Sequence, residues 1–573
     1  MAGQPVMRSD TTLGSSFAGR AVTGLLPYVA VAVARHLDLI YLTQLERYNS
    51  MRLRGWIVRH WGIALDGRGA LVQVAVLGAG ILLAWLPLSS ILGFRYAGIG
   101  MLYIVWLAAG MWLRIRYTSL QVSQRLQWTS RTVRLAAVTS VLAAAVLLVI
   151  AWSSVAVLSW LTVAPRALLV GIGLAAGLFV VSEGAAGTVL VANLSLAPLE
   201  RTINRRFYTQ ATARMGHYPG EVIGITGSYG KTTTKFITAA LLQGRYSVFK
   251  TPDGVNTTMG IVRVVREGLR DDHRFFVVEV AAYGPGEIRE VCEVLRPRLG
   301  ILTAVGVQHL ERFGTPERIA EAKYELIDSL PPDGLAIVNA DDPVCLRLAE
   351  RARREGRRVL LYGIGEDERM LGVRGKEIKL SSKGSAFRVE TEHGVAMFET
   401  RLLGGWNIGN ILGATAAALE CGVPLEEIAD GVRALTPAPK RLEIREEGGV
   451  IKLIDVANAN PRGAQMALEV LSQFEGGSKI LITPGLVELG QIEAEENRRL
   501  GRAAAAVCDY VVLVGPQQTQ PLREGLREAG FSGSRVLIAR HADEVADCLK
   551  AIVCEGDVLL YENRLPDTYL EFA

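Results

Sequence analysis

Cysteine is scarce in this sequence, and its spacing excludes several kinds of site. The 573 residues include six cysteines, all of them after residue 290, with no CxxC pair and no Cys/His metal pattern. This usage argues against a disulfide framework and fits reduced thiols in a cytoplasmic compartment. The first twenty residues also lack the compact signal-peptide pattern with a small-residue cleavage site.

Net charge is also small, and long hydrophobic runs are absent from most of the chain. A net charge of +5 gives no support for a nucleic-acid partner, and we expect none. The mean hydropathy of +0.26 is high for a soluble protein, and nearly all of the excess lies before residue 195. The sequence therefore predicts an α-helical membrane domain over residues 1–195, followed by soluble α/β domains.

Four segments of the N-terminal third are apolar and long enough to span a hydrocarbon core, which needs about 20 helical residues. They are Ala70–Leu92, Tyr96–Leu113, Val133–Leu161 and Ala167–Val191. A fifth segment, 21–42, is interrupted by Arg35, His36 and Asp38, and either spans the membrane or lies in its interface. Glu183 lies inside the last span. Two interpretations stay open: it marks a headgroup or substrate pocket, or it lies near a helix end or against a partner helix.

The loops between these segments predict the orientation of the chain. Arginines are concentrated in residues 47–68, 114–131 and 201–214, whereas the connections near residues 94–95 and 164–166 are very short. Arginine-rich loops face the cytoplasm in multi-span proteins. We therefore expect a multi-pass protein of the inner (plasma) membrane, with its catalytic domains in the cytoplasm and membrane lipids among its partners.

A phosphate-binding loop follows the membrane domain. Residues 222–226 form a short apolar strand, the glycine-containing segment 227–234 follows at once, and residues 236–242 have helical spacing. In such a strand–loop–helix unit, backbone N–H groups and the helix N-terminus face the phosphates, Lys231 reaches the terminal ones, and Thr232 binds Mg²⁺. Gly224 lies one position too early for the common G-x-x-x-x-G-K-[ST] spacing. The predicted cradle consists of Gly227, Ser228, Tyr229, Gly230, Lys231, Thr232 and Thr233.

The motifs that follow, over about residues 220–570, resemble those of the Mur ligase family. Within the family they are most similar to the branch that adds D-alanyl-D-alanine to a muramoyl tripeptide. They are, in the family's order, 226–235, 254–261, 277–288, 300–309, 320–327, 339–343, 404–418, 439–443, 455–461 and 483–490. The resemblance implies a central doubly wound ATPase domain over 215–436, with a small β excursion at 366–402. It also implies a C-terminal Rossmann-like domain over 440–573.

The resemblance also implies roles for individual residues. Glu279 ends a buried strand and would share a magnesium with Thr232, while His309 and Lys323 would hold a second one. The lysine is carbamylated in several relatives. The implied catalytic residues are Lys231, Glu279, His309 and Lys323, the metal ligands are Thr232, Glu279, His309 and Lys323, and the other nucleotide-binding residues are Asn339, Asn407, Asn410, Arg441 and Asp455.

Departures from the family pattern leave the acceptor amine open. Trp406 replaces a usual histidine, Val456 and Ala457 replace a serine and a tyrosine, and segment 556–564 replaces a Lys-Gly-Ser-Arg turn. The resemblance implies an ADP-forming ligase that uses ATP and Mg²⁺ to join a carboxylate, soluble or lipid-linked, to an amine through an acyl phosphate. The alternatives are a polymer-forming ligase similar to poly-γ-glutamate synthase, and an ATP-driven transporter, for which the sequence offers no signature helix.

Overall fold

The computed structural model describes residues 29–30, 32–45, 48–59, 126–161, 166–307, 310–364, 371–457 and 460–564. The chain divides into two compact units, one up to Ile203 and one from Asn204 to Glu571, and each is considered by itself. The predicted spans 70–92 and 96–113 lie outside the described residues.

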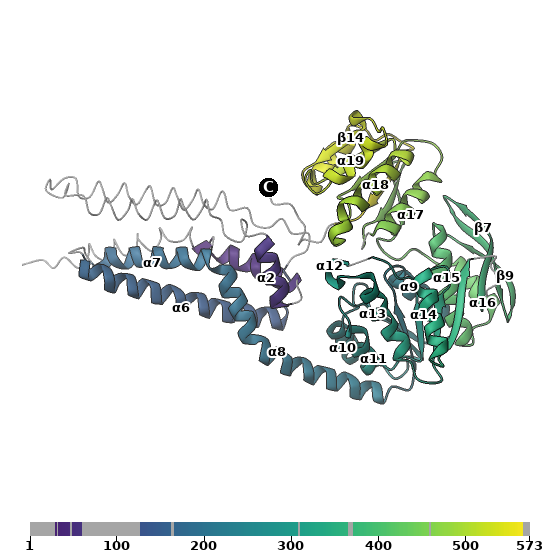
Figure 1. Ribbon diagram of the computed structural model, residues 1–573, viewed down its shortest axis with the longest axis horizontal. Helices are drawn as coiled ribbons and strands as arrows, with labels where there is room; N and C mark the ends of the chain where they lie inside the picture. Colours follow the sequence, from purple (N-terminus) through teal and green to yellow (C-terminus); the bar gives the residue numbers. More distant parts are fainter. Residues whose placement is uncertain are drawn as a thin grey trace, which may run out of the picture. The chain divides into compact units, whose positions relative to one another are not determined.

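The first unit is helical. Its elements are residues 32–45, α2 (Ser50–Arg59), α6 (Ser130–Leu161), α7 (Arg166–Glu183) and α8 (Ala185–Gly216), which continues past the unit boundary. Helices α6 and α7 lie side by side (Figure 1). Within the described residues, one helical segment, Ser130–Val157, is long and apolar enough to cross a membrane. The predicted span Ala167–Val191 is divided, because α7 ends at Glu183 and α8 begins at Ala185.

Ion pairs connect the helices of this unit. Arg35 Nη1 lies 2.5 Å from Glu183 Oε1 and also donates to Ser182 Oγ. Glu183 is therefore the last residue of its helix and is paired with a neighbouring helix, as the second of the two interpretations expected. A second carboxylate, Glu200, accepts a hydrogen bond of 2.7 Å from Arg134 Nε. Paired charges avoid the cost of an isolated buried charge.

The second unit begins with a nine-stranded sheet in the order β2-β3-β1-β4-β5-β6-β7-β8-β9. The strands are β1 (Glu221–Thr226), β2 (Val248–Lys250), β3 (Phe275–Glu279), β4 (Leu299–Leu302), β5 (Leu335–Asn339), β6 (Arg358–Ile364), β7 (Val373–Ser381), β8 (Gly384–Thr391) and β9 (Gly394–Thr400). Pairing is parallel from β2 to β7. The central strands are continuous apolar runs, as expected of a sheet covered on both faces.

Helices cover both faces of this sheet (Figure 1). One face carries α9 (Lys231–Gln243), α15 (Gly405–Glu420) and α16 (Leu425–Arg433), and the other carries α10 (Thr258–Glu267), α11 (Glu287–Leu295), α13 (Pro316–Asp328) and α14 (Pro343–Arg354), with α12 (Leu310–Phe313) beside α13. This is the doubly wound α/β domain that the resemblance implied. The β segment expected at 366–402 contains the antiparallel strands β8 and β9, which continue the main sheet.

The C-terminal part of the second unit is a smaller α/β sheet in the order β10-β11-β15-β12-β13-β14. Its strands are β10 (Glu443–Glu447), β11 (Val450–Asp455), β12 (Lys479–Thr483), β13 (Tyr510–Val514), β14 (Val536–Ala539) and β15 (Val558–Glu562), and its helices are α17 (Pro461–Ser472), α18 (Glu493–Val507), α19 (Gln520–Glu528) and α20 (Val545–Lys550). All strands except β10 pair in parallel. This is the C-terminal α/β domain that the resemblance implied. The carboxyl ends of β11, β15 and β12 lie next to one another.

Candidate active site

The loop between β1 and α9 has the backbone geometry of a phosphate cradle. Gly227 has a φ of 150° and Gly230 a φ of 80°, and α9 begins directly after Gly230. A Cβ atom at Gly227 would lie 2.1 Å from Thr303 Oγ1, so a larger residue does not fit. The loop is further held by a hydrogen bond of 2.7 Å from Ser228 N to Ala304 O. The N-terminus of α9 therefore opens toward the site with free N–H groups, a ready anion-binding arrangement.

A buried carboxylate lies beside this helix start. Glu279 ends β3, which pairs with β1, and its side chain is 3% exposed. Thr232 Oγ1 donates to Glu279 Oε2 over 2.8 Å, and Asn256 Nδ2 donates to Oε1 over 3.1 Å. Lys235 Nζ lies 3.3 Å from Oε2. Burial alone would raise the pKa of Glu279, but Lys231 and Lys235 together with these hydrogen bonds hold it below its usual value.

Two further lysines carry perturbed pKa values. Burial lowers the pKa of Lys231 to about 8, although Glu279 acts in the opposite direction, and its Nζ donates to Ser228 O over 2.9 Å. Burial, reinforced by the charge of Lys231, lowers the pKa of Lys323 on α13 to about 7. The predicted metal ligand His309 lies outside the described residues.

These side chains differ in how well they suit magnesium. A hydroxyl and a carboxylate oxygen on adjacent elements, as at Thr232 and Glu279, are ligands that Mg²⁺ accepts. In the described part of the chain, no three His, Cys, Asp or Glu side chains converge on one point, so phosphate and water would complete such a coordination shell. The charged form of Lys323 has no lone pair and its neutral form offers nitrogen, whereas Mg²⁺ prefers oxygen ligands, so Lys323 fits the second metal only after carbamylation.

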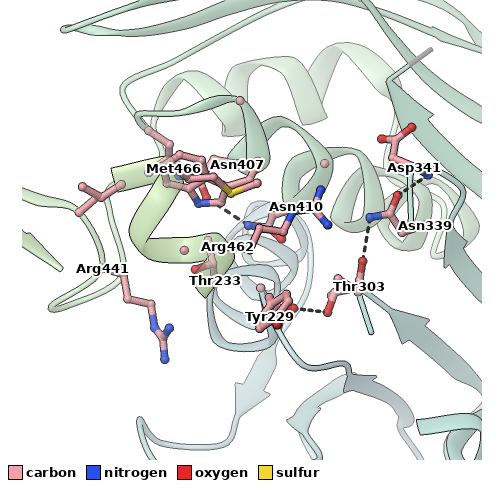
Figure 2. A pocket seen from close by; sticks show the side chains of 18 of the residues that line it. Tyr229, Thr233, Thr303, Asn339, Asp341, Asn407, Asn410, Arg441, Arg462 and Met466 are labelled. Carbon is pink, nitrogen blue, oxygen red and sulfur yellow. Dashed lines mark hydrogen bonds between the residues drawn. The ribbon is translucent and has the colours of Figure 1, made fainter. Parts of the chain in front are cut away.

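A cavity of about 710 Å³ opens beside the phosphate loop. Residues of both the central domain and the C-terminal domain line it. This volume is within the usual range of ligand pockets, roughly 300–1,000 Å³. Figure 2 shows the predicted nucleotide-binding asparagines along its wall. Asn410 Oδ1 accepts from Thr234 Oγ1 over 3.2 Å and Asn410 Nδ2 donates to Asn407 Oδ1 over 3.1 Å. Asn339 Nδ2 donates to Thr303 O over 2.8 Å.

Arg441 belongs to the C-terminal domain, and its side chain reaches this site. Its Nη2 donates to Thr232 Oγ1 over 3.1 Å, and its Nη1 donates to Ala457 O over 3.4 Å. The flanking residues Lys440 and Leu442 have φ values of 62° and 46°, conformations that cost energy for non-glycine residues and cluster at functional sites. A guanidinium from one domain thus reaches the phosphate loop of the other.

Arg312 and Glu488 form a second connection between the two domains. Arg312 Nη2 lies 2.9 Å from Glu488 Oε1. Glu488 belongs to the Glu-Leu-Gly motif and has a φ of 64°. The two domains are therefore held together by at least these two contacts.

The structure brings most of the predicted site residues together. Glu279 and Arg441 both contact Thr232 at the end of the phosphate loop. The cavity is lined by Asn339, Asn407, Asn410, Arg441 and Asp455. Burial raises the pKa of Asp455 to about 6. Sequence reasoning missed Lys235, whose spacing of one helical turn from Lys231 was the available signal. It also missed Thr303, whose hydroxyl donates to Tyr229 O over 2.5 Å, and Arg462, another cation on the cavity wall.

Comparison with protein families agrees with this geometry. Residues 225–418 match the Mur ligase middle domain, and residues 440–561 match the Mur ligase glutamate ligase domain. Together the two matches cover more than half of the chain. They begin after the first unit, so residues 1–224 lie outside them.

Three curated relatives share one name. The chain is 31% identical to the UDP-N-acetylmuramoyl-tripeptide–D-alanyl-D-alanine ligase of Mycobacterium tuberculosis (strain CDC 1551 / Oshkosh), over 59% of this chain and 66% of the relative. It is 29% identical to the ligases of that name from Bacillus subtilis (strain 168) and Escherichia coli (strain K12), over 60% of this chain and 72% and 73% of those proteins. The chain thus spans about two thirds of the length of these relatives.

Solved structures show the same fold. MurF from Acinetobacter baumannii is similar with a TM-score of 0.57 and 26% identity, covering 64% of this chain and 78% of that chain. The MurF ligase of Thermotoga maritima in complex with ADP is similar with a TM-score of 0.56 and 28% identity, covering 64% and 81%. With its central and C-terminal domains both matched, this chain belongs to the Mur ligase family.

Proposed function

We propose that this chain is an ATP- and Mg²⁺-dependent, ADP-forming ligase that joins a carboxylate of a cell-envelope peptide precursor to an amine. The observation that carries the proposal is the contact of Arg441 with Thr232, because it closes a phosphate loop with a group from the second domain. A ligase needs such closure to protect an acyl phosphate from water. The relatives' names, and the ADP in one of the similar structures, support the same activity.

The residues suggest how the reaction proceeds. The loop and the α9 N-terminus would hold the phosphates, and Lys231 and Arg441 would neutralise charge as the γ-phosphoryl group passes to the carboxylate. Magnesium, held by Thr232 and Glu279, would withdraw charge from the phosphate oxygens. The acceptor amine then attacks the acyl phosphate and forms a tetrahedral species, which collapses to an amide and phosphate.

Other residues have supporting roles in this proposal. Asn339, Asn407 and Asn410 would line the adenosine side of the cavity. His309 and carbamylated Lys323 would serve a second magnesium, as the resemblance implies. Positioning and electrostatics would supply most of the rate enhancement, since no covalent enzyme intermediate is needed.

For residues 1–195 we propose a multi-pass anchor in the inner membrane, with the catalytic domains on the cytoplasmic side. The apolar helix Ser130–Val157 and the arginine-rich loops support this assignment. Large apolar side chains such as Leu148, Trp152 and Trp160 are exposed along α6, as expected of a lipid-facing helix. A lipid-linked carboxylate would then be concentrated at the same surface as the enzyme. The competing interpretation is a plain tether with a soluble substrate.

The decisive measurement is phosphate release by the purified, detergent-solubilised chain with ATP and Mg²⁺. Muramoyl-peptide substrates, soluble and lipid-linked, would be combined with a panel of amines. We expect release only when a carboxylate and an amine are both present, and its loss when Mg²⁺ is chelated. ATP turnover that is independent of any amine would refute the ligase proposal, and a preference for the lipid-linked substrate would distinguish a substrate-binding anchor from a tether.

A further inference from the structure

Lys235 is a fully buried lysine beside the carboxylate assigned to magnesium. It lies on α9, one helical turn after Lys231, and its side chain is 0% exposed. Its Nζ lies 3.3 Å from Glu279 Oε2 and donates to Pro252 O over 3.4 Å. A lysine is almost never fully buried unless it is paired. Because the hydrogen bond to Pro252 is long, the ion pair with Glu279 is the contact that compensates the buried charge.

Neutral groups already orient Glu279 through both of its oxygens. Thr232 Oγ1 donates to Oε2, the oxygen that faces Lys235, and Asn256 Nδ2 donates to Oε1. The backbone of Glu279 is fixed as well, because its N–H donates to Thr251 Oγ1 over 3.2 Å. These contacts hold the carboxylate in place without adding any charge. The particular contribution of Lys235 is therefore its positive charge.

Positive charge exceeds negative charge around this carboxylate. Arg441 acts electrostatically on both Lys231 and Lys235. Among the described residues, the carboxylates that oppose these cations are the buried Glu279 and the exposed Asp253. Such a surplus attracts an anionic nucleotide and repels a free divalent cation. Mg²⁺ also gives up its water reluctantly and is usually held by one or two carboxylates together with substrate phosphates.

We propose that Lys235 is the fixed counter-ion of Glu279 and prevents the nucleotide-free site from binding a free divalent cation, so that magnesium enters together with nucleotide phosphate. Lys235 acts through Glu279 and is therefore a positioning residue rather than a metal ligand. The inference rests on the proposed function, because it concerns the magnesium of that reaction. It gives a role to Lys235, which the sequence motifs left without one.

The test measures binding of Mn²⁺ alone to the nucleotide-free, full-length protein by electron paramagnetic resonance, which detects the free ion. Lys235→Met removes the charge and keeps an unbranched side chain of similar length. A positive charge within about 4–6 Å lowers the affinity of a carboxylate for its proton by about 10- to 1,000-fold, and it repels a divalent ion in the same way. We therefore expect Lys235→Met to bind Mn²⁺ more tightly than wild type, by about tenfold or more.

Two further variants separate the charge from other effects of the substitution. Lys235→Gln keeps a hydrogen-bond donor for Glu279 and should show the same tightening. Lys250→Met is the matched control, because Lys250 and Lys235 lie over the same Phe236 ring, with Nζ 5.1 Å and 5.3 Å from its centroid. Lys250 pairs with no carboxylate in the described part of the chain, so its loss should change Mn²⁺ binding by less than about twofold.

Thermal unfolding provides a second measurement, since removing one partner of a buried ion pair destabilises a protein. Mn²⁺ at about ten times its Kd should raise the unfolding temperature of nucleotide-free Lys235→Met by about 2 °C, because the ion replaces the missing counter-ion. The same Mn²⁺ concentration should leave wild type unchanged. The double variant Lys235→Met/Glu279→Gln should lose both the tighter binding and the rise in unfolding temperature, because the carboxylate is gone.

The outcomes separate this inference from the proposed function. Unchanged or weaker Mn²⁺ binding in both Lys235 variants, or an equal tightening in Lys250→Met, would overturn it. Tightening that persists in the double variant would place the ion away from Glu279 and would overturn it too. Unchanged Mn²⁺ binding together with amine-dependent phosphate release would leave the ligase function standing without this inference. Tighter binding in a protein that shows no amine-dependent release would keep the role of Lys235 and remove the ligase function.

Discussion

Replacing Arg441 by alanine should slow catalysis more than it weakens nucleotide binding. Arg441 comes from the C-terminal domain and reaches Thr232 at the start of α9. The contact exists only when the two domains are together around the cavity. Its contribution therefore belongs to the closed, reacting complex, and its loss should lower kcat while the affinity for ATP changes little.

The magnitude follows from the contacts that Arg441 makes. A hydrogen bond to a charged group is worth about 1.5–3 kcal/mol, and each 1.4 kcal/mol corresponds to a factor of about ten. Arg441→Ala should accordingly lower kcat by about 10- to 150-fold. Arg441→Lys should give an intermediate loss, because a lysine keeps the charge but cannot reach Thr232 and Ala457 O at once.

The assay is phosphate release by the detergent-solubilised chain at saturating carboxylate and amine, with ATP varied. Arg445→Ala is the matched control, since Arg445 lies in β10, is about half exposed and pairs with Glu443 at 2.8 Å. Exposed ion pairs contribute about 0–1 kcal/mol, so this variant should stay within about fivefold of wild type. A loss in Arg441→Ala confined to the KM for ATP, or no larger than that of the control, would refute the argument.

Three further predictions concern the contact between the domains and the phosphate loop. Arg312 and Glu488 are 26% and 13% exposed, so a double-mutant cycle on kcat/KM should give a coupling energy of about 1 kcal/mol; additive effects would exclude a functional contact between the domains. Asn410→Ala removes the acceptor of the Thr234 hydroxyl and should raise the KM for ATP about tenfold, with kcat changed less. Gly230→Ala places a Cβ 2.4 Å from Asn410 Oδ1 at a φ of 80°, and should weaken binding of a fluorescent ATP analogue by about tenfold or more; unchanged binding would show that the loop relaxes freely.

The nucleotide side of the site could be predicted from sequence because its signals are local. A strand, a glycine turn and a Lys-Thr pair lie within about ten residues, and Glu279 ends an apolar run that only a buried strand explains. The order of the parallel strands then places Glu279 beside Thr232 without further information. The family motifs added Asn407, Asn410 and Arg441 in the same way.

The contacts that depend on register between distant segments could not be predicted. Asp455 and Glu562 are more than a hundred residues apart and become neighbours only through the pairing of β11 with β15. The sequence marked segment 556–564 as a departure from the family pattern, but not its partner. The pair of Arg312 with Glu488 depends likewise on how two domains meet. Hydrophobic periodicity and amino-acid composition do not predict which distant segments of a chain come into contact.

The residues of the second unit support one view of how specificity is divided. The groups that would handle ATP, including Lys231, Glu279 and Arg441, match the family pattern, whereas the departures lie at Trp406, at Val456 and Ala457, and near Glu562. Phosphoryl transfer makes the same electrostatic demands on every family member, so its residues tolerate little change. Recognition of the acceptor has no such constraint, because a pocket needs only to complement one partner and exclude others.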